Sequence, residues 1–285
     1  MKNFFKVVDI EDVWDLRGLF PVVDQETLPL ASTVGRILAE AVIADLDIPG
    51  FARSTMDGYA LQGATTFGAT ESNPGYLTVV GSVAMGERPD LRVGPGEAVR
   101  IATGGMLPPG ADAVIMIEHT EVLDDTTIEI YKSVAPGQHV VAQGEDIARG
   151  NALLAGGQPV RPQEAGLLAA LGCETVRVFR KPRIGIISTG DEVVPVTAVP
   201  GPGQIRDVNS TTLTAMTTAA GGQPNVYGIV QDSLALLKTT CTRALAENDM
   251  VLVSGGSSVG MRDFTIEAFE AQEDAHIMVH GVSIS

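Results

Sequence analysis

The chain has 285 residues, 45% of them hydrophobic, and a formal net charge of −16 at pH 7. This length suggests about two domains, and the acidic balance argues against nucleic-acid binding, which needs a basic surface. No apolar run of about 18 residues and no signal-peptide pattern occurs, so the sequence predicts no membrane contact and no secretion. Its two cysteines, Cys173 and Cys241, lie far apart, which disfavours a disulfide framework or zinc site and makes the cytoplasm the expected location.

The N-terminal half changes from a helical to a strand pattern. Apolar residues at helical spacing predict an amphipathic helix over residues 9–20, and a short helix followed by a strand is expected between Pro29 and Pro49. From there to about residue 146, short apolar runs separated by Gly and Pro predict an all-β domain. Its expected strands cover residues 76–83, 97–103, 112–118 and 126–131.

The C-terminal half predicts a parallel sheet. Residues 147–180 have helical character, with Pro162 where a helix would begin. Beyond Pro182, strands and helices alternate, which implies parallel strands covered on both faces. The expected strands are residues 183–188, 225–230 and 249–254, and the expected helices are residues 208–222 and 233–247.

A Gly/Ser-rich loop, Ser254-Gly255-Gly256-Ser257-Ser258, connects the last of these strands to a helical pattern that starts near Arg262. Glycines allow close backbone approach and a helix N-terminus attracts anions, so the loop suits a phosphate. Its spacing matches neither GxxxxGK[ST] nor GxGxxG, and a tight strand-to-helix turn is an equally good interpretation. A phosphate in so acidic a chain would favour a divalent cation held between carboxylates and ligand.

Further polar residues follow the first strand of this sheet, at Ser188, Thr189, Gly190 and Asp191. The carboxyl ends of parallel strands are where open α/β sheets bind ligands. Asp191 and Asp207 fit a metal or a ribose hydroxyl, although each also fits a solvated loop acid. Asn209 or Ser210 fits the cap of the helix that follows as well as it fits a ligand contact.

Seven motifs occur in a fixed order: PGFARSTMDGYAL, IATGGMLPPGADAVIMIE, GEDI, RPQEAGLLAALG, ISTGDEVV, GQIRDVNS and DMVLVSGGSSVGMRDFT. Together they resemble the molybdopterin molybdenumtransferase family, which contains MoeA and the E domain of gephyrin, from about residue 30 onward. The resemblance implies a split helical linker domain (1–45 and 147–181), an inserted β domain (46–146) and a MogA-like α/β molybdopterin-binding domain with a parallel sheet core (182–285). It also implies a further C-terminal β domain that is absent from this sequence, so we expect a C-terminally truncated family member.

The resemblance implies a chemistry, which is the Mg²⁺-dependent insertion of molybdate into adenylylated molybdopterin with release of AMP. The implied catalytic set is Asp57, Thr103, Asp146, Glu164 and Asp207, of which Asp57, Asp146 and Glu164 are expected Mg²⁺ ligands. The implied molybdopterin-binding set is Ser188, Thr189, Gly190, Asp191, Asn209, Ser254, Gly255, Gly256, Ser257, Ser258, Gly260 and Asp263. Expected partners are a second copy of the chain and the molybdopterin adenylyltransferase that acts upstream.

One departure from the family pattern supports an alternative function. Family members commonly carry an arginine just before GEDI, whereas residues 138–143 contain neither Lys nor Arg. An anion contact is therefore expected to be missing there. The alternative is a non-catalytic relative that binds molybdopterin or acts as a scaffold.

Overall fold

The computed structural model describes residues 7–255, 264–270, 275–279 and 281–283. The site predictions for Gly256, Ser257, Ser258, Gly260 and Asp263 lie outside these residues. The chain divides into two compact units, unit 1 (Met1–Glu40 with Gly156–Ser285) and unit 2 (Ala41–Ala155). Unit 2 is wider than the β domain expected over 46–146, because β4 and β13 at its two ends pair with each other. Within the described ranges, no helix is long and apolar enough to cross a bilayer.

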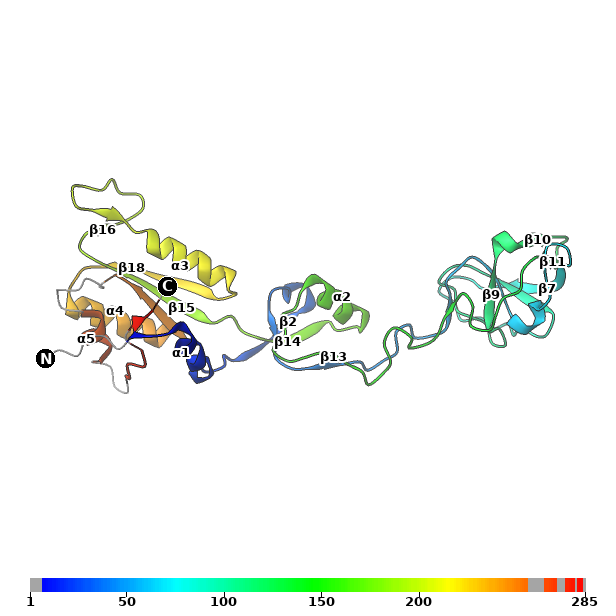
Figure 1. Cartoon of the computed structure of the whole chain (residues 1–285), viewed down its shortest axis with the longest axis horizontal. Coiled ribbons are helices and arrows are strands. Elements are labelled where there is room, and N and C mark those ends of the chain that lie inside the picture. The colour runs from blue at the N-terminus through cyan, green and yellow to red at the C-terminus, as the bar shows by residue number, and fades with distance from the viewer. Residues whose placement is uncertain (1–6, 256–263, 271–274, 280, 284–285) are drawn as a thin grey trace. The chain divides into compact units, whose positions relative to one another are not determined.

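Unit 2 is built from short strands, as the spacing of its apolar runs predicts. Its elements are β4 (Val42–Ile43), β5 (Arg53–Ser54), β6 (Gly58–Leu61), a 3-10 turn η3 (Gly63–Thr66), β7 (Gly75–Ser82), β8 (Glu97–Ile101), β9 (Ala113–Met116), η4 (Ile117–His119), β10 (Thr120–Val122), β11 (Thr127–Ile130), β12 (Val140–Val141) and β13 (Ala152–Leu154). Six of these strands form one sheet in the order β10-β11-β7-β8-β6-β9 (Figure 1). Its buried side chains include Leu61, Ile115 and Ile128.

Strand β6 lies between β8 and β9, so all of its residues are buried. This crowding explains Gly58, which opens the strand. A Cβ on Gly58 would lie 1.9 Å from the carbonyl oxygen of Ile115. Only glycine allows β9 to approach so closely, so the Asp57-Gly58 pair has a packing reason in addition to its turn signal.

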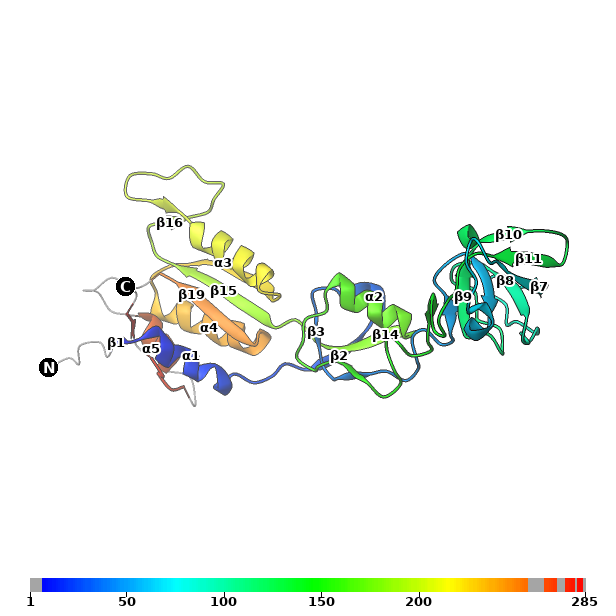
Figure 2. The same cartoon turned by 45° about the vertical axis from the view of Figure 1, so that its right-hand side comes forward.

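Unit 1 contains the parallel sheet. Its elements are β1 (Val7–Val8), α1 (Ile10–Asp15), η1 (Leu16–Leu19), β2 (Gln25–Pro29), η2 (Leu30–Ser32), β3 (Ile37–Leu38), α2 (Pro162–Ala170), β14 (Thr175–Phe179), β15 (Arg183–Thr189), β16 (Val193–Val194), β17 (Ile205–Arg206), α3 (Val208–Ala219), β18 (Gln223–Val230), α4 (Leu234–Glu247), β19 (Met250–Ser254), α5 (Phe264–Glu270) and β20 (Gly281–Val282). Strands β18-β15-β19 pair in parallel, with β15 in the centre. Helices α3 and α4 lie on opposite sides of this sheet (Figure 2).

Sequence explains this layering. Central strand β15 is buried from Ile184 to Thr189, and a strand covered on both faces needs a nearly continuous apolar run. Helix α4 turns Leu237, Cys241 and Ala244 toward Ile187 of the sheet, at the helical spacing that its sequence predicts. The α/β plus all-β fold predicted from the sequence is confirmed.

The segments nearer the N-terminus differ from the expected helices. The helix expected over 9–20 is only α1 followed by the 3-10 turn η1, and the short helix expected after Pro29 is the 3-10 turn η2. An antiparallel sheet, β2-β14-β3, also occurs where a helical domain was expected, beside α2. These strands pair across more than 130 residues of sequence, so the apolar pattern of any one of them carries little signal.

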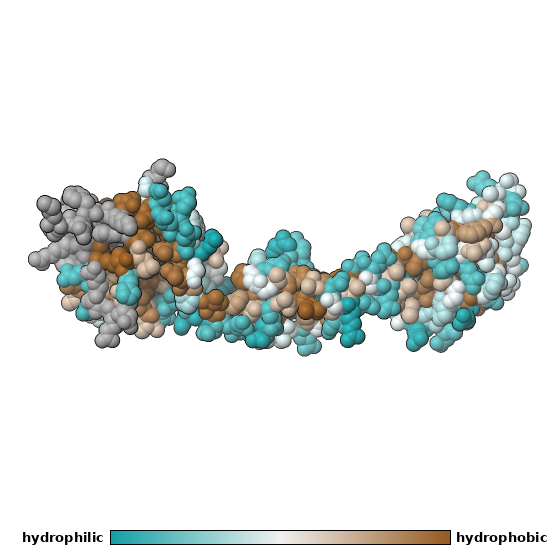
Figure 3. All heavy atoms as spheres, turned by 60° about the horizontal axis from the view of Figure 1, so that its bottom comes forward, coloured by the Kyte–Doolittle hydropathy of each residue, from teal (hydrophilic) through white to brown (hydrophobic). Residues whose placement is uncertain are grey.

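Apolar side chains reach the surface on both units (Figure 3). Trp14 and Phe20 are 61% and 59% exposed in unit 1, and Met85 is 60% exposed in unit 2. Scattered apolar residues are normal on globular proteins. They do not mark a site by themselves.

Candidate ligand pocket and the Asp57 loop

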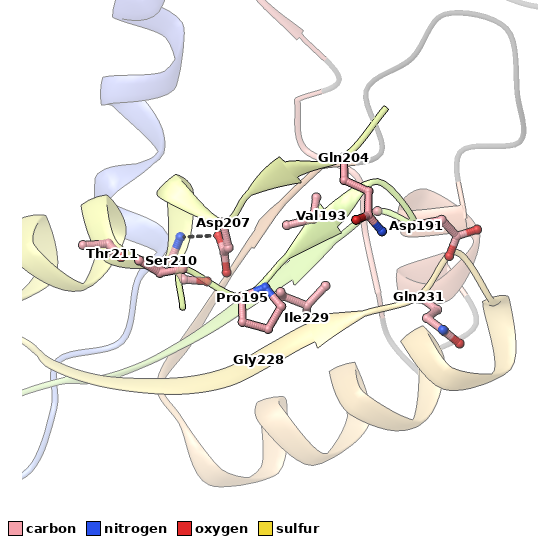
Figure 4. A pocket seen from close by; sticks show the side chains of 12 residues that line it. Asp191, Val193, Pro195, Gln204, Asp207, Ser210, Thr211, Gly228, Ile229 and Gln231 are labelled. Atoms are coloured by element: carbon pink, nitrogen blue, oxygen red, sulfur yellow. Dashed lines mark hydrogen bonds between the residues drawn. The ribbon is translucent and has the colours of Figure 1, made fainter. Parts of the chain in front are cut away.

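A pocket lies at the carboxyl ends of β15 and β18, beside the start of α3 (Figure 4). We call it the α3 pocket, and its volume is about 650 Å³. Its lining comprises Gly190, Asp191, Val193, Pro195, Val196, Gln204, Asp207, Ser210, Thr211, Gly228, Ile229 and Gln231. The carboxyl edge of a parallel sheet was the expected place for a ligand.

Asp207 and Ser210 form the side of the pocket at the N-terminus of α3. Asp207 is the N-cap, and its Oδ1 accepts a hydrogen bond of 3.0 Å from the Ser210 backbone N–H. Asn209 and Ser210 had been suggested as the cap, so that assignment is corrected to Asp207. The hydroxyl of Ser210 is buried and has no hydrogen-bond partner among the described residues. A buried unpaired hydroxyl costs free energy, so a ligand or water that pairs with it is favoured there.

The other lining residues determine which class of ligand the α3 pocket suits. Val193, Pro195, Val196 and Ile229 are apolar, and Gln204 and Gln231 provide amides. Asp191 and Asp207 are the only charged residues among those that line the α3 pocket. Two carboxylates with no cation among the lining residues repel a phosphate and accept hydrogen bonds from N–H groups. The pocket therefore suits a flat heterocycle with N–H donors better than it suits a phosphate.

The strand ends at Ser188 and Ser254 come together as neighbours on β15 and β19. Thr189 Oγ1 donates to the Ser254 carbonyl at 3.3 Å, and the two serine hydroxyls are 3.5 Å apart. Gly255 has a φ of 106°, and a Cβ there would lie 2.2 Å from the Thr189 carbonyl oxygen. This close approach gives Gly255 a structural reason to be glycine.

A pocket was expected between these two strand ends, with the Gly255 amide facing it. Gly255 does not line the α3 pocket, and Gly256, Ser257 and Ser258, whose amides were also expected to face a pocket, lie outside the described residues. Of the predicted molybdopterin-binding residues, Gly190 and Asp191 line the pocket, whereas the exposed Asn209 does not.

In unit 2, the predicted residues Asp57 and Thr103 bind each other. Asp57 Oδ1 accepts from the Thr103 backbone N–H at 2.7 Å and from Thr103 Oγ1 at 2.9 Å. The backbone bond, followed by the hydroxyl bond, lowers the pKa of the Asp57 carboxyl below its usual value. Asp146 also lies in unit 2 and is exposed.

Glu164, in unit 1, has a structural partner. It is buried at the first turn of α2, and both of its carboxylate oxygens bind Arg161, with Nε–Oε2 at 3.0 Å. The Arg161 side chain holds the pKa of Glu164 at about 2. Glu164 therefore caps α2 and neutralises Arg161.

Two of the three acids predicted to hold Mg²⁺, Asp57 and Glu164, have partners within the protein. Arg161 occupies both oxygens of Glu164, and Thr103 occupies one oxygen of Asp57. No group of three His, Cys, Asp or Glu side chains among the described residues is placed to hold a metal ion. Asp57 and Asp146 belong to unit 2 and Glu164 to unit 1, and their assignment to Mg²⁺ stays a prediction.

Sequence reasoning missed part of the pocket. Ser210 was considered only as a cap or ligand contact, Gln231 was not considered, and the pairing of β16 with β17 was not predicted. A partial signal was present, because Gln204 and Asp207 belong to one of the recognised motifs. The apolar wall comes from Val193–Val196, whose short pattern does not predict a strand pair.

Comparison with known proteins identifies both halves. Residues 8–172 match the family described as "MoeA N-terminal region (domain I and II)", and residues 185–285 match "Probable molybdopterin binding domain". A putative molybdopterin biosynthesis protein of Methanocaldococcus jannaschii is 36% identical over 90% of this chain and 63% of its own length. A molybdopterin molybdenumtransferase of Nostoc is 36% identical over 92% of this chain and 59% of its own length.

A solved structure agrees with these matches. The crystal structure of the MoeA molybdopterin biosynthesis protein of Pyrococcus horikoshii has a TM-score of 0.83 and 38% identity, over 97% of this chain and 69% of that one. The chain thus spans about six tenths of the length of the curated relatives that it matches. Because the N-terminal match alone covers more than half of the sequence, the chain belongs to the MoeA family of molybdopterin biosynthesis proteins.

Proposed function

We propose that this chain binds adenylylated molybdopterin through the α3 pocket and inserts molybdate into it, with release of AMP. The observation that carries this proposal is the buried, unpaired Ser210 hydroxyl in a pocket at the carboxyl edge of the parallel sheet. Support comes from the family of the chain and from relatives named molybdopterin molybdenumtransferase. Molybdenum cofactor biosynthesis is the process in which such a protein acts.

The pocket's residues suit the pterin part of this substrate. A pterin is flat, presents N–H donors along one edge and offers an apolar face. The Asp207 and Asp191 carboxylates accept such donors, and Ser210 provides a hydroxyl that donates or accepts. Val196 and Ile229 offer apolar contacts to the ring. The phosphates then point away from the two carboxylates, which would repel them.

The reaction cleaves the phosphoanhydride bond with an oxygen from water or molybdate, so that AMP and the molybdopterin phosphate are both left as monoesters, and the two dithiolene sulfurs displace two oxygens of molybdate. The chain's own contribution is to bind the pterin end and hold it in one orientation, which lowers the entropic part of the barrier. In unit 2, the Asp57 carboxylate keeps one oxygen that Thr103 does not bind, which agrees with the catalytic role expected of Asp57. No step is assigned to Mg²⁺, because Arg161 binds both oxygens of Glu164 and Thr103 binds one oxygen of Asp57.

The test is to incubate the chain with adenylylated molybdopterin and molybdate and to measure AMP by chromatography. Asp57→Asn should abolish AMP release without lowering the melting temperature, since an amide oxygen still accepts both Thr103 bonds. Surface changes of this kind usually alter stability by no more than about 0.5 kcal/mol. A large fall in melting temperature would show that Asp57 serves the fold instead.

A non-catalytic molybdopterin-binding function is the second candidate. It is favoured by the Arg161 contacts that occupy Glu164, a residue expected to hold the metal. Binding of molybdopterin with no molybdate-dependent AMP release, in a preparation that holds Mg²⁺, would support it. We further propose that the active form is a homodimer supplied by a molybdopterin adenylyltransferase. Sedimentation of the purified chain tests the dimer.

A further inference from the structure

One wall of the α3 pocket is formed by β16, β17 and the residues between them, which we call the β16–β17 arm (193–206). Its two strands pair in parallel. The Nε of Arg206 donates to the carbonyls of Val196 and Ala198, both at 3.1 Å. The arm is therefore held in one conformation by its own hydrogen bonds.

Gln204 is fixed within this arm by two hydrogen bonds to a single residue. Its backbone N–H donates to the Gly201 carbonyl at 3.0 Å, and its Oε1 accepts the Gly201 N–H at 3.0 Å. Since a backbone N–H can only donate, the atom of the Gln204 amide that faces it must be the oxygen. The orientation of the amide is thereby determined, and Nε2 is its other end.

Gln204 lines the α3 pocket (Figure 4). Because its oxygen binds Gly201, the group that Gln204 can offer to a ligand in the pocket is the Nε2 donor. Gln204 is exposed, so water also reaches its amide. A ligand is favoured by the buried Ser210 hydroxyl, and Gln204 bears on which atoms that ligand carries.

The two kinds of polar group in the lining suit a ring that carries both donors and an acceptor. The carboxylates of Asp191 and Asp207 accept N–H groups. A ring with N–H groups alone would leave the Gln204 donor without an acceptor, which costs free energy once the ligand excludes water. A pterin carries both kinds of group, because one of its carbonyls lies next to a ring N–H. In diaminopteridine an amino group replaces that carbonyl oxygen, so a donor stands where the pterin has an acceptor.

We propose that Gln204 is a specificity-determining residue of the α3 pocket. Its Nε2 donates to the ring carbonyl oxygen of a pterin and disfavours a ring with an amino group at that position. Specificity is a difference of two affinities, and a fixed donor that meets another donor lowers the affinity for the wrong ring. This role rests on the proposed function, because it takes the pterin as the ligand of this pocket.

The test compares pterin with diaminopteridine in fluorescence titrations of the full chain, at a pH at which neither ring is protonated. The measured quantity is the ratio of the pterin affinity to the diaminopteridine affinity. Gln204→Glu keeps an oxygen for the Gly201 N–H but replaces the donor by an acceptor. It should lower the pterin affinity about tenfold to hundredfold and lower the ratio by at least about tenfold. The melting temperature should stay unchanged, because the bond to Gly201 persists.

Two control variants separate specificity from the shape of the arm and from charge. Arg206→Ala removes the bonds that hold the arm but keeps the Gln204 amide. It should weaken the binding of both rings equally, so that the ratio does not change. Gln231→Glu adds the same negative charge to the lining of the pocket and should also leave the ratio unchanged.

The specificity of Gln204 and the proposed function fail in different ways. If the wild type binds pterin and Gln204→Glu has an unchanged ratio, Gln204 does not determine specificity, and the proposed function stands. A fall of the ratio in Arg206→Ala or Gln231→Glu as large as in Gln204→Glu would also overturn the role of Gln204. A wild type that binds no pterin would remove both proposals. A lowered ratio in Gln204→Glu, in a chain that releases no AMP, would support the role of Gln204 and contradict only the insertion of molybdate.

Discussion

In unit 2, segments 53–57, 103–106 and 138–141 are joined by hydrogen bonds, and we call them the β5 loop cluster. The α3 pocket and the β5 loop cluster contain similar polar residues, but the hydrogen bonds of those residues are satisfied in opposite ways. In the pocket, the Ser210 hydroxyl is buried without a partner beside the carboxylate of Asp207. In the cluster, Asp57 and Thr103 bind each other, and the Ser54 hydroxyl binds the Met56 backbone at 2.6 Å. Motif residues that look alike in sequence therefore hold a loop together in one unit and leave a hydroxyl free for a ligand in the other.

The largest loss of stability is expected from a substitution of Gly58, which directly follows Asp57 of the β5 loop cluster. Gly58→Ala places a Cβ 1.9 Å from the Ile115 carbonyl oxygen, so β6 and β9 must separate. We expect unit 2 to lose about 3 kcal/mol or more of its free energy of unfolding, measured by urea denaturation. Gly50→Ala is the control, since its nearest neighbour is 3.8 Å away and its cost should be within about 0.5 kcal/mol. Equal stability of both variants would remove the packing explanation for the Asp-Gly pair.

Ser210→Ala tests the pocket side of the comparison. Removing an unpaired buried hydroxyl should leave stability unchanged or raise it by up to about 1 kcal/mol. If Ser210 binds the pterin, affinity should fall about tenfold, the effect of one hydrogen bond, measured by pterin fluorescence. Thr212→Ala is the control, because Thr212 is exposed and its hydroxyl binds the Val208 carbonyl of its own helix. A clear loss of stability in Ser210→Ala would mean that the hydroxyl is satisfied in solution by water.

The parallel sheet and Ser210 show which features the sequence predicts and which it does not. The apolar run of β15 and the helical spacing of Leu237 and Cys241 are local signals, and the parallel sheet predicted from them is confirmed. The sequence places Ser210 at the start of a helix, where a serine is often a cap. Only the folded path of β16, β17 and the residues between them shows that Ser210 lines a cavity. The partner of Asp57 is Thr103, which lies 46 residues away in the sequence, and no local pattern contains that information.

Acid should destabilise unit 1 through Asp249 and Glu164. The Arg180 side chain lowers the pKa of Asp249 from 3.8 to about 2, and Arg161 lowers that of Glu164 from 4.5 to about 2. Because these pKa values are lower in the folded state, the two carboxylates are protonated in the unfolded state before they are protonated in the folded state as the pH falls. Their stabilising contribution is therefore complete above about pH 4.5 and is lost as the pH falls toward 2.

The measurement is thermal melting, monitored by circular dichroism, at pH values from 6 to 2. This range includes the pH interval in which both carboxylates titrate. Asp249→Asn should lower stability at pH 6 and flatten the acid limb of the curve. Asp24→Asn is the control, since its carboxylate is 90% exposed and lies 3.6 Å from the same Arg180. An unchanged acid limb in Asp249→Asn would show that the Arg180 pair does not set the acid stability.

The smallest expected effect concerns His139, whose carbonyl joins two segments of the β5 loop cluster although its own backbone conformation is strained. Its φ of 61° is in the left-handed region, where a side chain is strained by about 1 kcal/mol. The reason for that conformation is the His139 carbonyl, which accepts the Thr55 N–H and so fixes the turn before Asp57.

His139→Gly keeps this carbonyl and removes the strain, although glycine also adds entropy to the unfolded chain. We therefore expect a net change within about 1 kcal/mol, whereas His139→Val should destabilise by about 1–2 kcal/mol because a β-branched residue tolerates this φ worst. Urea denaturation of the two variants measures the difference. If valine is as stable as histidine, the left-handed backbone is not retained in solution, and the cluster is less rigid than its hydrogen bonds indicate.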